Sequence, residues 1–362
     1  MNLSDINIRR TGRTAGLAAA MLCGLLGSSC DNTIYDDEGD CAPRYKVGFV
    51  YDRNMKWADA FPHEVEAVKL HLIDADGKVA AVFQESGERL DHAGYTMDID
   101  VVPGRYTLMA WAGDKDGQSF EYGGDLLARS AVSVPYPDYK PGCENLTMRM
   151  RRQSLYGEAV SRENLSRLYH GVLADVDFPD GEGEHKVTVS LTKNTNYIKV
   201  VLQQMAGLPM EMKDLKVTIT DDNGMMEWDN SLRQEETITY RPWNVKTIAA
   251  SISPDSGDGD GLGTATTYTG LMAEFTTARL MEGHRETARL TVSYKGKPTF
   301  SVKLIDFLLM VKGEYNRAMN DQEYLDRQDA FDLVFFLDEG HEWTNPVIFI
   351  NSWKVVLQNT KL

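Results

Sequence analysis

Four cysteines carry most of the chemistry that residue types and spacing suggest in this chain: Cys23, Cys30, Cys41 and Cys143. Cys30 directly follows three small residues, at 27–29, which end a short apolar stretch. A cysteine in this position is typical of bacterial lipoproteins, in which the thiol is acylated and the signal is cut before it. The spacing therefore predicts that Cys30 carries lipid and becomes the new N-terminus.

The residues before Cys30 form a predicted secretory signal over 1–29. Arg9, Arg10 and Arg13 make its basic region, and residues 15–26 make its apolar region. Gly27 stands where the usual lipoprotein motif has leucine, three positions before the cysteine. An ordinary cleaved signal followed by an incidental cysteine is therefore the alternative interpretation.

An acidic stretch follows at residues 30–40, with five carboxylates: Asp31, Asp36, Asp37, Glu38 and Asp40. We expect a structureless tether here, because charged residues of one sign repel and cannot build a core. Two interpretations stay open, a surface-export signal or a merely solvated linker. Ten residues between Cys30 and Cys41 span at most about 35 Å.

Cys41 and Cys143 remain once the signal is removed and Cys30 is acylated. An exported protein meets an oxidising environment, so the sequence predicts one disulfide between them. It would close a loop of about 100 residues, which the chain-entropy model values at up to about 4–5 kcal/mol. The sequence has no C-x-x-C pair, and therefore no zinc-ribbon or thioredoxin-type pattern.

Other signatures of chemistry are weak. None of the seven histidines has H-E-x-x-H spacing, and neither a phosphate-binding loop nor a G-x-S-x-G elbow occurs. The run from Asp255 to Gly261 resembles a calcium loop, but Thr267 stands where the bidentate Glu belongs. Tyr122, Tyr136 and Tyr139 suit either sugar stacking or the cover of a sandwich end. We therefore predict no enzyme activity, catalytic residue, metal or cofactor.

The composition limits the class of protein. The 362 residues are 42% hydrophobic and 25% charged, as in globular proteins of about two domains. Loss of the signal removes three arginines and one aspartate, which takes the net charge from −16 to −18. Such an acidic protein is a poor partner for nucleic acid. No apolar run reaches the roughly 18 residues of a membrane-spanning helix.

Alternation of period two dominates the chain and predicts an all-β fold. Residues 68–72 and 79–83 alternate around an Asp-Gly turn at 74–77, which is a strong hairpin signal. The second half repeats the design, with alternation at 215–219 and a turn at 221–224. We predict two tandem β-sandwiches, an N-terminal domain over 41–152 and a C-terminal domain over 153–362.

Further elements complete this prediction. We expect a hairpin with strands at 288–294 and 299–311, and closing strands at 332–337 and 347–357. Short helices are expected over 54–61, after Ser161 as N-cap, and after Asn320, which has Glu323 three residues on.

Residues 51–61 (YDRNMKWADAF) carry a family resemblance, together with 168–171 (LYHG), 191–196 (LTKNTN) and 350–354 (INSWK). They resemble the FimB/Mfa-type fimbrial anchor lipoproteins of Bacteroidia over essentially the whole mature chain. The resemblance implies two transthyretin-like β-sandwich domains without catalytic residues. It also implies acylation of Cys30 and a disulfide at the positions of Cys41 and Cys143.

The resemblance further implies a role. Members of this family sit on the outer membrane, hold the base of a fimbria built from fimbrillin subunits and limit its length. Strand addition between subunits makes the predicted strand at 347–357 a candidate docking edge. The alternative hypothesis is a surface glycan-binding lipoprotein. A secreted hydrolase, the third class, lacks every signature tested.

Overall fold

The computed structural model describes residues 44–123, 142–204, 210–252, 266–313, 316–343, 347–351 and 353–356. The signal region, Cys30, the acidic tether, Cys41 and the acidic run at 255–261 lie outside them. Strands dominate the described part, which confirms the all-β class. Within that part, no helix has both the length and the apolar character needed to cross a membrane.

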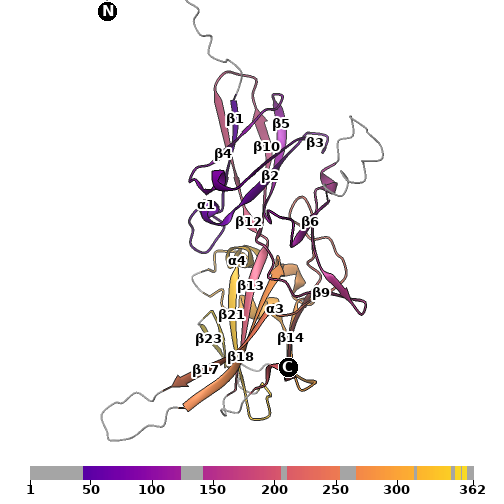
Figure 1. The fold of residues 1–362 in the computed structure, drawn as a ribbon. Coiled ribbons are helices and arrows are strands. Elements are labelled where there is room, and N and C mark those ends of the chain that lie inside the picture. Colours follow the sequence, from indigo (N-terminus) through magenta and orange to yellow (C-terminus); the bar gives the residue numbers. More distant parts are fainter. Residues whose placement is uncertain are drawn as a thin grey trace, which may run out of the picture. The chain divides into compact units, whose positions relative to one another are not determined.

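Two sheets enclose a first hydrophobic core, in which Val47, Leu70 and Leu108 are fully buried. One has the strand order β11-β1-β4 and the other β12-β10-β5-β2-β3. Figure 1 shows β1, β2, β4, β5 and β10 gathered together. The strands are β1 (Arg44–Val50), β2 (Ala67–Ile73), β3 (Val79–Ser86), β4 (Thr96–Ile99), β5 (Gly104–Gly113), β10 (Leu168–Phe178), β11 (Glu184–Ser190) and β12 (Thr192–Lys193).

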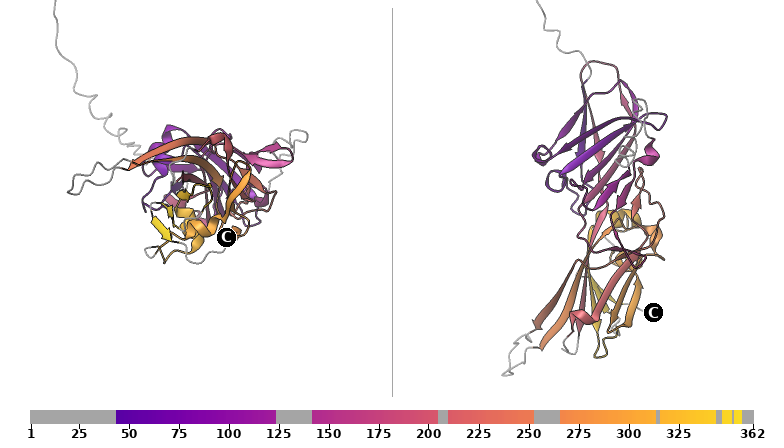
Figure 2. Two further views of the ribbon diagram at one scale, coloured as in Figure 1. Left: turned by 90° about the horizontal axis from the view of Figure 1, so that it is seen from below. Right: turned by 45° about the vertical axis from the view of Figure 1, so that its right-hand side comes forward.

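Two six-stranded sheets enclose a second core, with the orders β17-β18-β13-β21-β22-β23 and β20-β19-β14-β16-β9-β8. Figure 2 shows both groups of strands from two further sides. The first sheet contains β13 (Thr195–Gln204), β17 (Asn244–Ile252), β18 (Thr266–Ala278), β21 (Ala330–Leu337), β22 (Val347–Ile350) and β23 (Trp353–Val356). The second contains β8 (Gln153–Leu155), β9 (Glu158–Ser161), β14 (Leu215–Asp221), β16 (Ile238–Tyr240), β19 (Arg289–Tyr294) and β20 (Lys297–Lys303).

A small sheet of order β15-β7-β6 extends the second core to the outer face of β5. Trp111 of β5 belongs to that core, and its indole N–H donates to the Leu146 carbonyl at 3.1 Å. The strands are β6 (Phe120–Tyr122), β7 (Met148–Met150) and β15 (Met225–Met226). The helical elements are α1 (Phe61–Glu64), α3 (Leu304–Leu309), α4 (Asp321–Arg327) and the 3₁₀ turns η1 (Glu88–Asp91), η3 (Cys143–Asn145), η4 (Met212–Asp214) and η5 (Glu282–His284).

Two predicted hairpins are confirmed. β2 and β3 pair in antiparallel register, and Gly77 in their turn has φ +73°, which glycine adopts without strain. β19 and β20 pair around Lys295 and Gly296, both with positive φ. The turn after β14 does not form a hairpin, because the short strand β15 that follows it pairs with β7 in another sheet.

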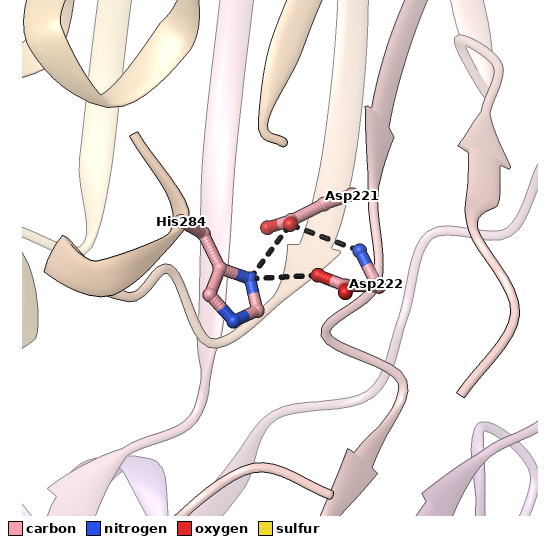
Figure 3. A group of neighbouring side chains, drawn as sticks. All are labelled: Asp221, Asp222 and His284. Atoms are coloured by element: carbon pink, nitrogen blue, oxygen red, sulfur yellow. Dashed lines mark hydrogen bonds and ion pairs between the residues drawn. The ribbon is translucent and has the colours of Figure 1, made fainter. Parts of the chain in front are cut away.

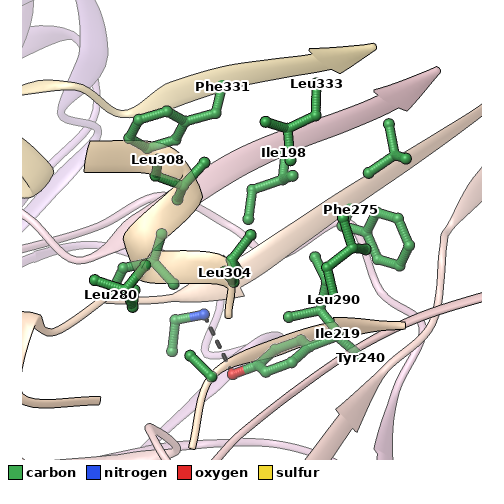
Figure 4. Packing of buried hydrophobic residues seen from close by; sticks show 14 of the residues in the cluster. Ile198, Ile219, Tyr240, Phe275, Leu280, Leu290, Leu304, Leu308, Phe331 and Leu333 are labelled. Carbon is green, nitrogen blue, oxygen red and sulfur yellow. Dashed lines mark hydrogen bonds between the residues drawn. The ribbon is translucent and has the colours of Figure 1, made fainter. Parts of the chain in front are cut away.

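Two other predicted elements are wrong. No helix follows Ser161, which ends β9 and is separated by six residues from Leu168, where β10 begins. The strand predicted over 299–311 ends at Lys303 and continues as α3. Leu304 and Leu308 lie one helical turn apart in α3, and both are fully buried in the second core (Figure 4). Residues 304–309 are therefore buried by the spacing of a helix, which the search for alternating strands did not detect.

Strand pairing crosses the domain boundary predicted at residue 152 in both directions. β7, which precedes the boundary, pairs with β15, and β10, which follows it, pairs with β5. β8 and β9 join β16 without crossing it. β11 lies parallel to β1, after which β13 returns to the second group. The division at 152 stays a prediction, and we propose that residues 168–193 belong to the first unit.

Candidate functional site

β23, the last strand in the described part of its sheet, is the structural counterpart of the docking edge predicted at 347–357. That segment forms a hairpin rather than one strand: β22 pairs with β21, and β23 folds back on β22. Asn351 takes φ 48° in the turn, and its side-chain oxygen accepts from the Asp332 N–H at 2.7 Å. Among the described strands β23 pairs only with β22, so it forms one edge of the described sheet.

Residues 51–60 form a loop held by side-chain hydrogen bonds, and α1 begins only at Phe61. The helix predicted over 54–61 is therefore wrong. The Asn54 amide donates to the carbonyls of Tyr51 at 2.8 Å and Ala58 at 2.7 Å. One carboxylate oxygen of Asp59 accepts from the N–H groups of Tyr51 and Phe61, both at 2.9 Å. These side chains satisfy the backbone locally, which competes with helix formation.

Trp57 projects from this loop. Its side chain is 63% exposed and its φ is 53°, an unusual value for a bulky residue. The Arg327 guanidinium lies 4.0 Å from the indole centroid, within the range of a cation–π contact. Arg327 also donates to the Asp52 carbonyl at 3.1 Å. The end of α4 therefore holds an exposed aromatic side chain in a fixed place.

Cys143 begins η3 beside the β2–β3 turn. Its backbone N–H donates to the Gly77 carbonyl at 2.9 Å. Its thiol is half-buried, and this burial raises its pKa. Cys143 forms no disulfide with a described residue. Because Cys41 and Cys30 lie outside those residues, the disulfide and the lipidation stay predictions.

Tyr122 is engaged within the fold. Its hydroxyl lies 2.5 Å from the His71 Nε2, and the Lys69 ammonium lies 4.4 Å from its ring centroid. Tyr136 and Tyr139 lie outside the described residues. Of the three tyrosines in the predicted cluster, only Tyr122 is described, and its half-buried ring contacts His71 and Lys69.

Asp221, Asp222 and His284 form a cluster that the sequence analysis missed. His284 Nδ1 lies 2.8 Å from an Asp221 carboxylate oxygen and 3.0 Å from one of Asp222 (Figure 3). Burial raises the pKa of Asp221, whereas its hydrogen bond raises the pKa of His284. Adjacent aspartates at a strand end were visible in sequence, but nothing there paired them with a histidine more than 60 residues away.

Comparison with known proteins identifies the family. The sequence model described as "Fimbrillin-A associated anchor proteins Mfa1 and Mfa2" matches residues 37–359. The minor fimbrium anchoring subunit Mfa2 of Porphyromonas gingivalis is 22% identical over 322 residues, 87% of each chain.

Solved structures agree with this assignment. A candidate adhesin of Bacteroides thetaiotaomicron is 31% identical with a TM-score of 0.70, covering 88% of this chain and 99% of that one. The fimbrial anchor protein Mfa2 of P. gingivalis has the same fold, with 17% identity, a TM-score of 0.61 and coverage of 88% and 100%. The chain therefore belongs to the family of fimbrillin-A associated anchor proteins, fimbrium-associated structural proteins and not enzymes.

Proposed function

We propose that this protein is an outer-membrane lipoprotein that holds the base of a fimbria at the cell surface and limits its length by binding fimbrillin subunits. The observation that carries the proposal is the family match over residues 37–359. The shared fold with the P. gingivalis anchor protein supports it.

The membrane end of the molecule would be Cys30. Two or more acyl chains hold a protein stably on a bilayer, at about 0.8 kcal/mol for each buried CH₂. The acidic tether would then keep the folded part within about 35 Å of the membrane surface. A disulfide between Cys41 and Cys143 would fix the end of the tether to η3.

The docking end would be β23. A fimbrillin strand laid along its open side would extend the six-stranded sheet by main-chain hydrogen bonds. β23 is one of the two edges of this sheet, with β17 at the other, and a single subunit docked on β23 would occupy the base of the filament.

Deletion of the gene tests the anchoring role. We expect long fimbriae shed into the medium, seen by electron microscopy of cell and supernatant fractions. Cys30→Ala should release the folded protein from the membrane and reproduce this shedding. Fimbriae of normal length still attached to cells lacking the gene would contradict the proposal.

A proline at residue 354 tests the edge itself. Ile350 and Trp353 close the β22–β23 hairpin, and hydrogen-bonded pairs alternate along an antiparallel ladder. The Lys354 N–H therefore points away from β22. Lys354→Pro removes that donor while keeping the hairpin, and should weaken fimbrillin binding at least about tenfold.

Lys354→Ala is the matched control, because it changes the same side chain and keeps the N–H. Binding that is equal in the two variants, with circular dichroism showing both folded, would exclude β23 as the docking strand. That result would leave the anchoring role untouched, because the shedding of fimbriae from the gene deletion and from Cys30→Ala tests it separately.

A glycan-binding role is the second candidate. A solved structure of B. thetaiotaomicron described as a candidate polysaccharide-binding protein is 28% identical, with a TM-score of 0.68. The exposed Trp57 offers a face on which a sugar can stack. A glycan array on which the wild type binds and Trp57→Ala does not would favour this role, and an array without signal would remove it.

A further inference from the structure

The Asp221, Asp222 and His284 cluster, here called the DDH cluster, brings three potential ligand atoms together. One atom from each residue lies within 4.8 Å of the other two. Figure 3 shows His284 facing both carboxylates. Asp221 is 1% exposed, and the side chains of Asp222 and His284 are 14% and 21% exposed. The cluster is therefore largely buried, and Asp222 and His284 keep partial contact with solvent.

Hydrogen bonds do not satisfy this cluster. A ring N–H at His284 Nδ1 donates to one acceptor, and the geometry assigns it to the nearer oxygen of Asp221. The Asp222 oxygen that faces the ring accepts no hydrogen bond, and neither does the second oxygen of Asp221, although both atoms are buried. Within the described residues, both aspartates form ion pairs with His284 alone. Unpaired buried carboxylate oxygens are costly unless something supplies positive charge.

We propose that the DDH cluster binds a divalent transition-metal ion, for which Zn²⁺ is the best match. Zinc takes imidazole nitrogen and carboxylate oxygen at about 2.0–2.2 Å, which places two ligands of a tetrahedral site about 3.4 Å apart. The observed separations of 2.8 and 3.0 Å lie within about 0.6 Å of that spacing, so small rotations of the side chains bring the three atoms to zinc distance. Imidazole favours zinc over the harder calcium and magnesium ions. Binding displaces the Nδ1 proton, and water completes the coordination.

The neighbouring residue holds this site in place. Asn223 is fully buried and donates to the carbonyls of Ala278 at 3.1 Å and Arg279 at 3.0 Å. The Tyr240 hydroxyl donates to the Asn223 oxygen at 2.6 Å. The Asp222 N–H donates to Asp221 at 2.9 Å, which orients that carboxylate. The ligands thus stand on a fixed backbone, as a metal site requires.

A metal here would join two sheets. Asp221 ends β14 in one six-stranded sheet, and His284 lies in η5, which follows β18 of the other. The ion would therefore link the end of β14 to the segment that follows β18 in the other sheet. It would stabilise the folded chain, because the three ligands come together only in the folded state.

Zinc titration of the mature protein, first stripped with EDTA, tests the proposal. We expect one zinc per chain by calorimetry. At zinc 100-fold above its Kd, we expect a rise in Tm of about 4 °C. Asp222→Asn and His284→Gln should each weaken zinc binding at least about tenfold. Neither variant removes Asp221, the most buried member, and circular dichroism in EDTA checks that both fold.

His92→Gln is the control for adventitious binding, because His92 is an exposed histidine outside the cluster. It should bind zinc as the wild type does. Absence of stoichiometric zinc binding, equal binding by all three variants, or selection of calcium over zinc would each overturn the proposal. Without bound zinc, His284 would act only as a hydrogen-bond donor to Asp221.

Discussion

Arg279 and Asp326 form a buried ion pair, with side chains 11% and 9% exposed. The guanidinium donates to both oxygens, at 2.8 and 2.7 Å, and its third contact is the Asn230 carbonyl at 2.6 Å. Asp326→Ala would leave a buried charge without its partner. We expect a loss of about 3–5 kcal/mol in the free energy of unfolding, measured in urea.

Glu286→Ala serves as the comparison for that variant. Glu286 pairs with Lys303 on the surface, with side chains 73% and 39% exposed. Its removal should change the free energy of unfolding by at most about 0.5 kcal/mol. Equal losses of unfolding free energy in Asp326→Ala and Glu286→Ala would show that burial does not determine how much the Arg279–Asp326 pair contributes to stability.

His170 makes stability depend on pH. Burial lowers its pKa to about 4, against the donation of its Nε2–H to the Trp228 carbonyl at 2.8 Å. In the unfolded chain this histidine has an ordinary pKa near 6.5. Between about pH 4 and 6.5 the unfolded chain therefore binds a proton at this residue and the folded chain does not. The stabilisation is complete above about pH 6.5 and declines as the pH falls toward 4, by about 2 kcal/mol between pH 7 and 5.

Urea unfolding at pH 7 and pH 5 measures this effect. His170→Gln keeps a donor for the Trp228 carbonyl and should lose about 2 kcal/mol less than the wild type over that interval. The exposed His92→Gln should behave as the wild type does. Identical pH dependence in wild type and His170→Gln would contradict the assignment.

At the scale of the element, the start of α4 was predicted from sequence and is confirmed. The Asn320 side chain accepts from the Glu323 N–H at 2.7 Å. Asn320→Ala should cost about 1 kcal/mol of stability, whereas Asn320→Asp should cost little because aspartate caps equally well. Thermal unfolding of both variants measures the difference, and equal Tm values would show that the cap contributes nothing.

Local rules predicted the elements that depend on local geometry. The Asp-Gly and Lys-Gly turns and the Asn320 cap require particular backbone angles or side-chain oxygens, which the sequence shows directly. β10 was missed because Leu168, Tyr169, His170 and Gly171 are buried in succession, so no alternation appears. α3 was missed because its apolar run continues that of β20.

The candidate sites divide in the same way. The docking edge was predicted from the strand pattern at 347–357 and from strand addition between subunits, although the turn at Asn351 was not foreseen. The DDH cluster could not be expected, since it depends on where η5 lies relative to the end of β14. Only tertiary structure supplies that relation.

At the scale of the whole molecule, the predicted disulfide would join the residues just before β1 to η3. Cys143→Ser should lower the free energy of unfolding by up to about 4–5 kcal/mol, and treatment of the wild type with dithiothreitol should have the same effect. A thiol assay on the acylated protein should find no free cysteine. Two free thiols would exclude the disulfide.

The parallel pairing of β1 with β11 has a mechanical consequence. β1 is the first described strand, so tension entering from the N-terminal side of the chain reaches it directly, and the predicted disulfide at Cys41 would pass part of that tension to η3. The pairing runs from Arg44 opposite Glu184 to Val50 opposite Ser190, and β4 holds the other side of β1. A pull along the strand axis loads these hydrogen bonds in shear, all together, instead of peeling them one by one. Rupture then requires the whole ladder to slide at once, which suits the proposed role of an anchor under drag from a filament.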